Sequence, residues 1–432
     1  MDPAITTLCV LAVAAFLFVT ELIPLAVTAM AACTALGILG VLPSKQVYAG
    51  LSNSTVVLFG GMFVIGAAMF KTGLAEAVGL WVVNKAGTKE VPLMGAIMVV
   101  TIALSAVSSN TGTVACLMPV IVGIANAAHI PASKELMPLA VAANVGGTIT
   151  MIGTPPNVIV TGALSAAGLP SFGFFEFALI GVPLSVIVLV YMLTIGRKTI
   201  PIKNAGAMDA AAVEAAKKEA GASDDNAPKS KTKMWISGLI LLGVVAAMAL
   251  NLKTVPLQTA AVTGAILCVI TGCLKEKEAY AGIDWVTIFL FAGMLSVATA
   301  MDKTGAGKLI ADTVVGMMGE HPNPIILCAV LYLISNVLTQ FMSNTASAAL
   351  LAPIGISIAQ SIGADPKPVL MSIGIAASMA FATPMATPPN TLVLGPGGFN
   401  FNDYVKVGVP LCIITFIASV IIIPIFWPFF PG

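Results

Sequence analysis

The stretch SAVSSNTGTVACLMP, residues 105–119, places a polar cluster inside a run that is otherwise apolar enough for lipid. Ser108, Ser109, Asn110 and Thr111 stand together at its centre. Each buried amide or hydroxyl without a hydrogen-bond partner costs on the order of 1 to 3 kcal/mol. An ordinary membrane helix would avoid such a cluster, so we expect something else to satisfy these groups.

The composition around this stretch is that of a polytopic membrane protein. Hydrophobic residues make up 58% of the 432 residues and charged residues only 9%, too little polar surface for a soluble globule of this length. Apolar runs of roughly 17 to 25 residues, each long enough for one helical crossing, recur along the chain. The fold class predicted is therefore all-α. The net charge of +1 argues against nucleic acid as a partner.

The chain contains two copies of one sequence unit, separated by a charged, Ala-rich linker at 197–234. The sequence SNTGTVACLMP (109–119) is echoed by SNTASAALLAP (343–353), and GTPPN (153–157) by ATPPN (386–390). The offsets stay near 230 residues, which indicates internal duplication into a first repeat, 1–196, and a second, 235–432.

Each repeat is predicted to contain five transmembrane helices, a re-entrant hairpin that carries SNT, and a helix broken at TPPN. The SNT segment is too long for one crossing and polar in its middle, and non-helical backbone at membrane depth is tolerated only inside protein or beside water. An odd number of crossings inverts the second repeat relative to the first. The expected segments are scaffold helices 1–43, hairpin 91–128 and broken helix 136–168, then scaffold helices 236–274, hairpin 324–361 and broken helix 367–396.

Charge suggests an orientation for this arrangement. With the linker in the cytoplasm, fifteen of the twenty Lys and Arg residues lie inside, as the positive-inside rule requires. Both termini then face out. The chain lacks a targeting extension, so we expect a prokaryotic inner membrane.

The repeated motifs have the chemistry of an ion and anion site. A helix start offers N–H groups to an anion, and consecutive prolines free the carbonyls upstream of them for a cation. Asn and Thr side chains can serve either ligand. The alternative is that Ser, Asn and Thr only join helices, as small polar residues often do in membranes. Two matched copies of SNT, each with a TPPN, favour ligand binding.

These paired motifs make the chain resemble the divalent anion/sodium symporters, the dicarboxylate and sulfate transporters. The resemblance implies homodimers whose scaffold stays fixed while a transport part moves across the bilayer like an elevator. It also implies two sodium sites, one at each hairpin tip. The first falls on Ser105, Ser109, Asn110 and Gly153, and the second on Thr339, Met342, Asn344 and Ala386.

The resemblance further implies where a substrate would bind, between the two tips. Met342 fits a sodium site only through its main-chain carbonyl, because a thioether is a poor ligand for a hard cation. The substrate residues expected are Asn110, Thr111, Thr154, Pro155, Ser343, Asn344, Thr345, Thr387 and Pro388.

We therefore expect a sodium-coupled symporter of a C4-dicarboxylate such as succinate, malate or fumarate. No Lys, Arg or His lies within the motifs to neutralise a dianion, so two or more sodium ions should bind with it. The alternatives are a sulfate or citrate transporter and a sodium-independent dicarboxylate exchanger. An intramembrane enzyme is not expected, because neither HExxH nor paired membrane aspartates occur.

Overall fold

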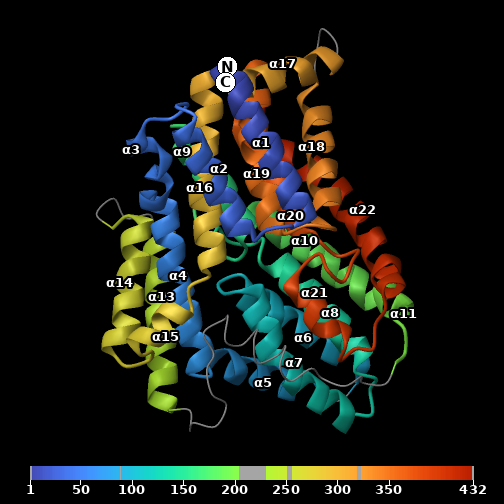
Figure 1. Ribbon diagram of the computed structural model, residues 1–432. Coiled ribbons are helices and arrows are strands. Elements are labelled where there is room, and N and C mark those ends of the chain that lie inside the picture. The colour runs from blue at the N-terminus through green and yellow to red at the C-terminus, as the bar shows by residue number, and fades with distance from the viewer. Residues whose placement is uncertain (1, 88, 204–229, 251–254, 319–322, 431–432) are drawn as a thin grey trace.

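The computed structural model describes residues 2–87, 89–203, 230–250, 255–318 and 323–430, and these contain helices and turns but no strand. Figure 1 shows the helices of the two halves intertwined. The first half comprises α1 (Pro3–Thr20), α2 (Leu25–Ile38), α3 (Ser44–Val47), η1 (Ala49–Ser52), α4 (Ser54–Lys71), α5 (Leu74–Ala86), α6 (Glu90–Ser105), α7 (Asn110–Ala127), α8 (Ser133–Gly146), α9 (Pro155–Ala166), α10 (Ala178–Tyr191), a π turn η2 (Met192–Gly196) and α11 (Arg197–Thr199).

The second half repeats this order with similar lengths. It comprises α13 (Lys231–Ala249), α14 (Leu257–Ile270), α15 (Glu276–Ala281), α16 (Trp285–Thr304), α17 (Ala306–Met318), α18 (Pro324–Thr339), α19 (Asn344–Ser361), α20 (Pro366–Ser378), α21 (Pro388–Leu394) and α22 (Phe401–Phe426). The two SNT hairpins match in length: their arms have 16 and 18 residues in each half.

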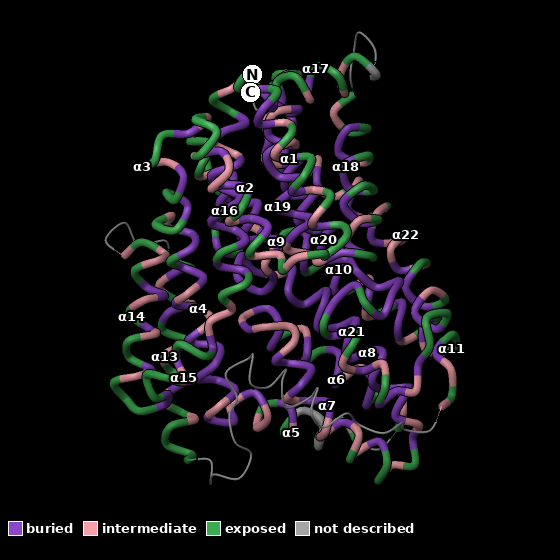
Figure 2. The backbone as a smooth tube through the Cα atoms, in the orientation of Figure 1, coloured by how far each residue is buried: buried purple, intermediate pink, exposed green. Residues whose placement is uncertain are grey.

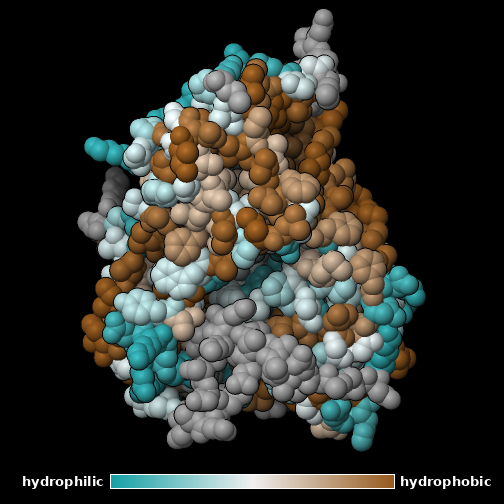
Figure 3. All heavy atoms as spheres, in the orientation of Figure 1, coloured by the Kyte–Doolittle hydropathy of each residue, from teal (hydrophilic) through white to brown (hydrophobic). Residues whose placement is uncertain are grey.

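Seven helices of the described residues are long and apolar enough to cross a membrane: α1, α4, α7, the run Ala178–Thr199, α13, α16 and α22. Four shorter apolar helices, α2, α6, α14 and α18, accompany them. Hydrophobic residues cover much of the middle and upper surface in Figure 3, and hydrophilic ones gather toward the rims. The chain is an all-helical integral membrane protein with multiple spans, as the composition predicts.

Helices reach into both ends of the predicted linker. Arg197–Thr199 still continues the helical run of α10, and α13 already begins at Lys231, within the predicted linker 197–234. The reason is that charged residues at a helix end stay in water without leaving the helix, so a charged stretch marks the edge of the apolar region and not the end of the helix. Residues 204–229 of the predicted linker lie outside the described residues.

The two halves cross each other at matched points. Helix α4 packs against α14 and α16 against α2. At Gly61 a Cβ atom would lie 2.7 Å from the main-chain carbon of Ala261, and at Gly293 one would lie 2.7 Å from that of Ala29. Only glycine permits such close contact, which is how small residues bring membrane helices together. The same glycine-on-alanine contact therefore occurs once for each half.

The last turns of α4 and α16 also make matching contacts with the other half. Lys71 forms an ion pair with Glu278 of α15, and Lys303 donates to Gln46 Oε1 of α3 over 2.6 Å. Each contact ties the last turn of one long helix to a short helix of the other half. Both lysines begin the sequence KTG, at 71–73 and 303–305, and the two copies thus have equivalent environments.

The hairpins and the broken helices form a second group. Hairpin α6–α7 packs on α8 in the lower part of Figure 1, and hairpin α18–α19 packs on α20 in the upper part. The helices after the TPPN motifs cross over: α9 contacts α19 and α20, while α21 contacts α7 and α8. This reciprocal packing buries the middle of the molecule, where Figure 2 shows mostly buried backbone.

Candidate functional site

The two SNT motifs form the turns between the hairpin arms. Helix α6 ends at Ser105 and α7 begins at Asn110, with Ser109 as the N-cap, whose Oγ accepts from the N–H of Gly112 over 3.3 Å. In the second half α18 ends at Thr339 and α19 begins at Asn344. The residues of both triplets are only half-buried, while most of the residues around them are buried. Both tips therefore combine helix N-termini with accessible polar side chains.

The first tip gathers four polar atoms around one point. One end of the Asn110 side-chain amide lies 2.7 Å from Ser105 Oγ and 3.1 Å from the main-chain oxygens of Ala143 and Gly153. If the amide nitrogen faces them, it can donate to these oxygens. If the amide oxygen faces them, four oxygens converge without an N–H donor, which is the ligand set that hard cations prefer.

The second tip repeats this cluster. Thr339 Oγ1 lies 2.6 Å from Asn344 Oδ1 and 2.7 Å from the main-chain oxygen of Ala377. A hydroxyl has one hydrogen, so it cannot donate fully to both oxygens at once. The carbonyl of Ala377 in α20 meets this tip as the carbonyl of Ala143 in α8 meets the first. The second tip thus holds more acceptors than donors, and the first does so when the Asn110 amide oxygen faces the cluster.

The TPPN motifs interrupt the helices that supply these carbonyls. Helix α8 ends at Gly146 and α9 starts at Pro155, where proline suits the first helical turn because its missing N–H would be unpaired there. The Asn157 side chain bridges the break by donating to the main-chain oxygens of Gly147 and Thr150, over 3.2 and 2.8 Å. The freed carbonyls nearest the break are therefore held by asparagine.

The second break uses the same bridge. Asn390 Nδ2 donates to the main-chain oxygens of Ala380 and Thr383, both over 2.9 Å. The hydroxyls of Thr150 and Thr383 in turn donate to the main-chain oxygens of Ala106 and Gln340, which follow α6 and α18. Each broken helix is thus fixed to the tip of its own hairpin.

Glycine is required at the first break. A Cβ at Gly147 would lie 2.7 Å from Asn110 Oδ1, and one at Gly153 would lie 2.4 Å from the main-chain oxygen of Gly147. The turn can fold back against the hairpin tip only because these positions carry no side chain. The two glycines thereby bring the Gly153 carbonyl to Asn110.

The structure brings together five of the predicted sodium residues, three at the first tip and two at the second: Ser105, Asn110 and Gly153, and Thr339 and Asn344. The side chain of Ser109 instead caps α7. Met342 and Ala386 are buried, and among the described residues neither has a hydrogen bond to Thr339 or Asn344. Their roles stay predictions.

The predicted substrate residues divide by accessibility. Asn110, Thr111, Ser343, Asn344 and Thr345 are half-buried at the tips, Pro155 is half-buried and Pro388 is exposed. Thr154 and Thr387 are buried, and the Thr387 hydroxyl accepts from the N–H of Asn390 over 3.4 Å.

Sequence reasoning missed the carbonyls of Ala143 and Ala377. A main-chain ligand leaves no mark in its side chain, so only the register between the two repeats could have singled out these alanines. Sequence reasoning also missed the bridging role of Asn157 and Asn390, although both belong to the repeated TPPN motifs.

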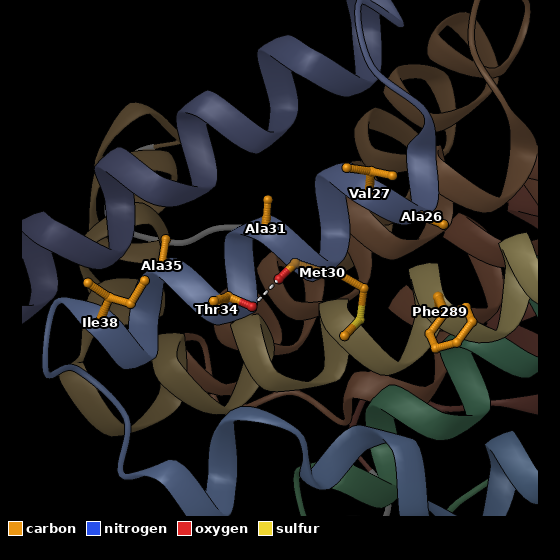
Figure 4. A pocket seen from close by; sticks show the side chains of 8 residues that line it. All are labelled: Ala26, Val27, Met30, Ala31, Thr34, Ala35, Ile38 and Phe289. Atoms are coloured by element: carbon orange, nitrogen blue, oxygen red, sulfur yellow. Dashed lines mark hydrogen bonds between the residues drawn. The ribbon is translucent and has the colours of Figure 1, made fainter.

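A hollow elsewhere among the described residues is unrelated to this cluster. It is a groove of about 640 Å³ along α2, shown in Figure 4 and lined by residues such as Val27, Met30, Ile38 and Phe289. Its one hydroxyl, on Thr34, already donates to the main-chain oxygen of Met30 over 2.7 Å. The groove lacks charged residues and offers an anion no polar recognition.

A family comparison agrees with this architecture. The model of the citrate transporter family CitMHS matches residues 15–366, most of the chain. The chain belongs to this citrate transporter family. It is a transporter and not an enzyme, and the predicted relationship to the divalent anion/sodium symporters is confirmed.

Relatives of this citrate transporter family member match along nearly its whole length. An uncharacterized transporter of Haemophilus influenzae is 30% identical over 97% of this chain and 91% of its own. The uncharacterized transporter YfbS of Escherichia coli is 26% identical over 98% and 99%. The sodium-dependent dicarboxylate transporter SdcS of Staphylococcus saprophyticus is 26% identical over 94% and 83%.

Two solved structures share the fold of this family member. The YdaH transporter of Alcanivorax borkumensis superposes with a TM-score of 0.67, covering 98% of each chain at 13% identity. MtrF of Neisseria gonorrhoeae superposes with a TM-score of 0.62, covering 92% of this chain and 86% of its own at 16% identity.

Proposed function

We propose that this transporter couples the uptake of a divalent anion to sodium, the anion being a C4-dicarboxylate such as succinate, malate or fumarate. The observation that carries the proposal is the matched cluster of oxygens at the two hairpin tips. A hydroxyl, an asparagine amide and at least one main-chain carbonyl meet at each tip, the kinds of oxygen that a small hard cation binds. The sodium-dependent relative SdcS adds support.

The absence of fixed charge explains why cations should accompany the anion. The turn segments 105–111, 147–157, 339–345 and 380–390 contain no charged residue and no histidine. A dianion moving into a negative cell faces roughly 2.3 kcal/mol per charge per 100 mV. Two bound sodium ions cancel that burden, and a third makes the membrane potential drive uptake.

We place the substrate between the two tips, in contact with the SNT side chains and the TPPN turns. The matched contacts of the two halves support an inverted repeat in which hairpins and broken helices form the transport part. The scaffold helices are α1 and α2 with α13 and α14. In this proposal the transport part moves as an elevator within a homodimer, and the linker faces the cytoplasm of a prokaryotic cell.

Citrate is the second candidate, because the family that contains the chain is described as a citrate transporter family. Sulfate and sodium-independent dicarboxylate exchange complete the alternatives. All four differ in which gradients and competitors matter, so one transport assay separates them.

The test is uptake of labelled succinate into proteoliposomes, with an inward sodium gradient or with choline in its place. We expect uptake only with sodium, and strong competition by malate and fumarate but weak competition by sulfate. Strong competition by citrate moves the assignment to the second candidate. Uptake that ignores sodium and needs internal dicarboxylate contradicts symport and indicates an exchanger.

Variants of the two tips tie this result to the site. We expect Ser105→Ala and Thr339→Val each to raise the half-saturating sodium concentration by about fivefold, because losing a ligand-forming oxygen costs on the order of 1 kcal/mol. Ser108→Ala is the matched control: its hydroxyl is buried nearby but has no hydrogen-bond partner in the described structure. Sodium dependence that is equal in all three variants contradicts the site.

A further inference from the structure

One side chain joins the two half-sites, each of which consists of one hairpin tip and the TPPN turn of the same half. Asn144 lies in α8, only 1% exposed, and its amide nitrogen donates to Thr387 Oγ1 over 3.2 Å and to Asn390 Oδ1 over 3.1 Å. Helix α8 belongs to the first half, whereas both acceptors belong to the TPPN motif of the second. The contact therefore crosses from one half to the other at the second break.

Ala143, the residue before Asn144, contacts the first half-site. The main-chain oxygen of Ala143 lies 3.1 Å from the Asn110 amide at the first tip. Two consecutive residues at the end of one helix thus face different clusters: the Ala143 carbonyl faces the first, and the Asn144 side chain faces the second. A displacement of this last turn of α8 changes both clusters together.

The second half lacks the reciprocal contact. The two breaks are related by a shift of 233 residues, which matches Asn144 with Ala377 of α20, and alanine has no side-chain donor. The hydroxyl of the next residue, Ser378, donates to Gly374 within its own helix over 3.1 Å. In keeping with this, the Oδ1 atom of Asn157 has no hydrogen-bond partner in the described structure, whereas Oδ1 of its counterpart Asn390 accepts from Asn144. The connection between half-sites is therefore asymmetric and runs through one asparagine.

Side chains of the second half also make more hydrogen bonds to the second break than side chains of the first half make to the first break. Asn336 donates to the main-chain oxygens of Ala376 and Met379, over 3.1 and 2.9 Å, and Gln340 Oε1 accepts from the N–H of Ala382 over 2.9 Å. The matching residues of the first half are Ile102 and Ala106, which carry no such groups. The first turn consequently has fewer braces, so its geometry depends more on a ligand.

We propose that Asn144 is a positioning residue that couples the two half-sites, so that cation binding at the first tip orders the TPPN turn of the second. This inference rests on the proposed function and deepens it. When a cation binds the Ala143 carbonyl, the last turn of α8 is fixed in place. Asn144 then holds Thr387 and Asn390 in the orientation that the second half-site needs.

The experiment is a sodium titration of succinate uptake at constant ionic strength, with wild type, Asn144→Ser and Ser378→Ala. Serine keeps a polar group at this position but is too short to reach Thr387 and Asn390. We expect sigmoidal sodium activation in wild type. In Asn144→Ser the Hill coefficient should fall toward 1 and half-saturating sodium should rise about 5-fold or more, the lower range of coupling between sites.

Controls separate coupling from damage to the fold. Ser378→Ala removes a hydroxyl that bonds only within α20 and should titrate like wild type. Thr387→Val removes one of the two acceptors of Asn144 and should lower the Hill coefficient in the same direction. The effects in the double variant should be less than additive, because the two residues share a contact. Sodium-induced thermal stabilisation of the purified protein gives the same readout without transport.

Several outcomes contradict the inference. If wild type depends on sodium and Asn144→Ser keeps its Hill coefficient and half-saturating concentration, coupling through Asn144 is wrong while the proposed function stands. Equal effects of Asn144→Ser and Ser378→Ala also exclude it. A wild-type protein that neither transports with sodium nor is stabilised by it contradicts the proposed function and, with it, the coupling.

Discussion

At the scale of single residues, the asparagines of the SNT and TPPN motifs divide into two classes by what their amides contact. Asn110 and Asn344 lie at the hairpin tips among an excess of oxygens. Asn157 and Asn390 hold the ends of broken helices by donating to main-chain carbonyls. The first class suits a ligand, whereas the second replaces the hydrogen bonds that the prolines remove.

We expect replacement of the bridging asparagines to destabilise the fold. Asn157→Ala and Asn390→Ala each leave two buried carbonyls unpaired, at about 1 to 3 kcal/mol for each group. Asn390→Ala should be the more costly, because it also removes the acceptor of Asn144. Thermal unfolding in detergent measures both. Equal stability of the two variants and wild type would show that water or other groups replace these bonds.

At the scale of elements, proline and glycine position set where helices stop. Pro155 and Pro388 begin α9 and α21, so both TPPN motifs mark helix starts. Helix α21 has 7 residues and α9 has 12, because the sequence GPGG at 395–398 follows α21 directly while alanines extend α9. The repeats are therefore alike at the motif and differ after it.

The crossings of α4 with α14 and of α16 with α2 give a prediction at this scale. Gly61→Ala and Gly293→Ala should each lower thermal stability, because the added carbon would lie 2.7 Å from backbone and the helices must separate. We expect a cost of roughly 1 to 3 kcal/mol for each. Gly60→Ala is the control, since no atom lies within 4 Å of a Cβ there. A larger loss in the control than at Gly61 or Gly293 contradicts the packing argument.

At the scale of the whole molecule, the two halves are held together at their rims as well as in the middle. The ion pair of Lys71 and Glu278 joins α4 of the first half to α15 of the second. Its counterpart, Lys303 with Gln46, has an uncharged partner. The two rims are therefore alike in geometry but differ in their response to pH.

This difference predicts an acid-sensitive contribution to stability. Partial burial disfavours the charged form of Glu278, but Lys71 and the main-chain N–H of Lys275 outweigh it and hold the pKa of this carboxyl below its ordinary value of 4.5. A depressed pKa contributes stability above the ordinary pKa, and this contribution is lost as pH falls through the folded-state value. The ion pair, partly exposed, is worth up to about 1 kcal/mol.

Thermal unfolding over a pH series checks this expectation. Glu278→Gln should be less stable than wild type at pH 7, and the difference should disappear as the carboxyl protonates below its ordinary pKa. Gln46→Ala should lose the same amount at every pH, because its contact does not titrate. A difference for Glu278→Gln that persists unchanged in acid contradicts the role of the charge.

The fold class and most element boundaries followed from the sequence. Apolar length decides which helices can cross a membrane, and prolines with polar triplets decide where they break. The hairpins predicted at 91–128 and 324–361 are found as α6–α7 and α18–α19. Helices reach into both ends of the predicted linker, because charge marks the edge of the apolar region and not the end of a helix.

The sequence by itself therefore determined a duplicated, all-helical membrane protein with two matched polar turns. Only the tertiary structure decided which carbonyls meet those turns, because a main-chain ligand such as that of Ala143 has no residue signature. The same holds for the contact of Asn144 with Thr387, whose partners lie 243 residues apart and meet only when the two halves pack together.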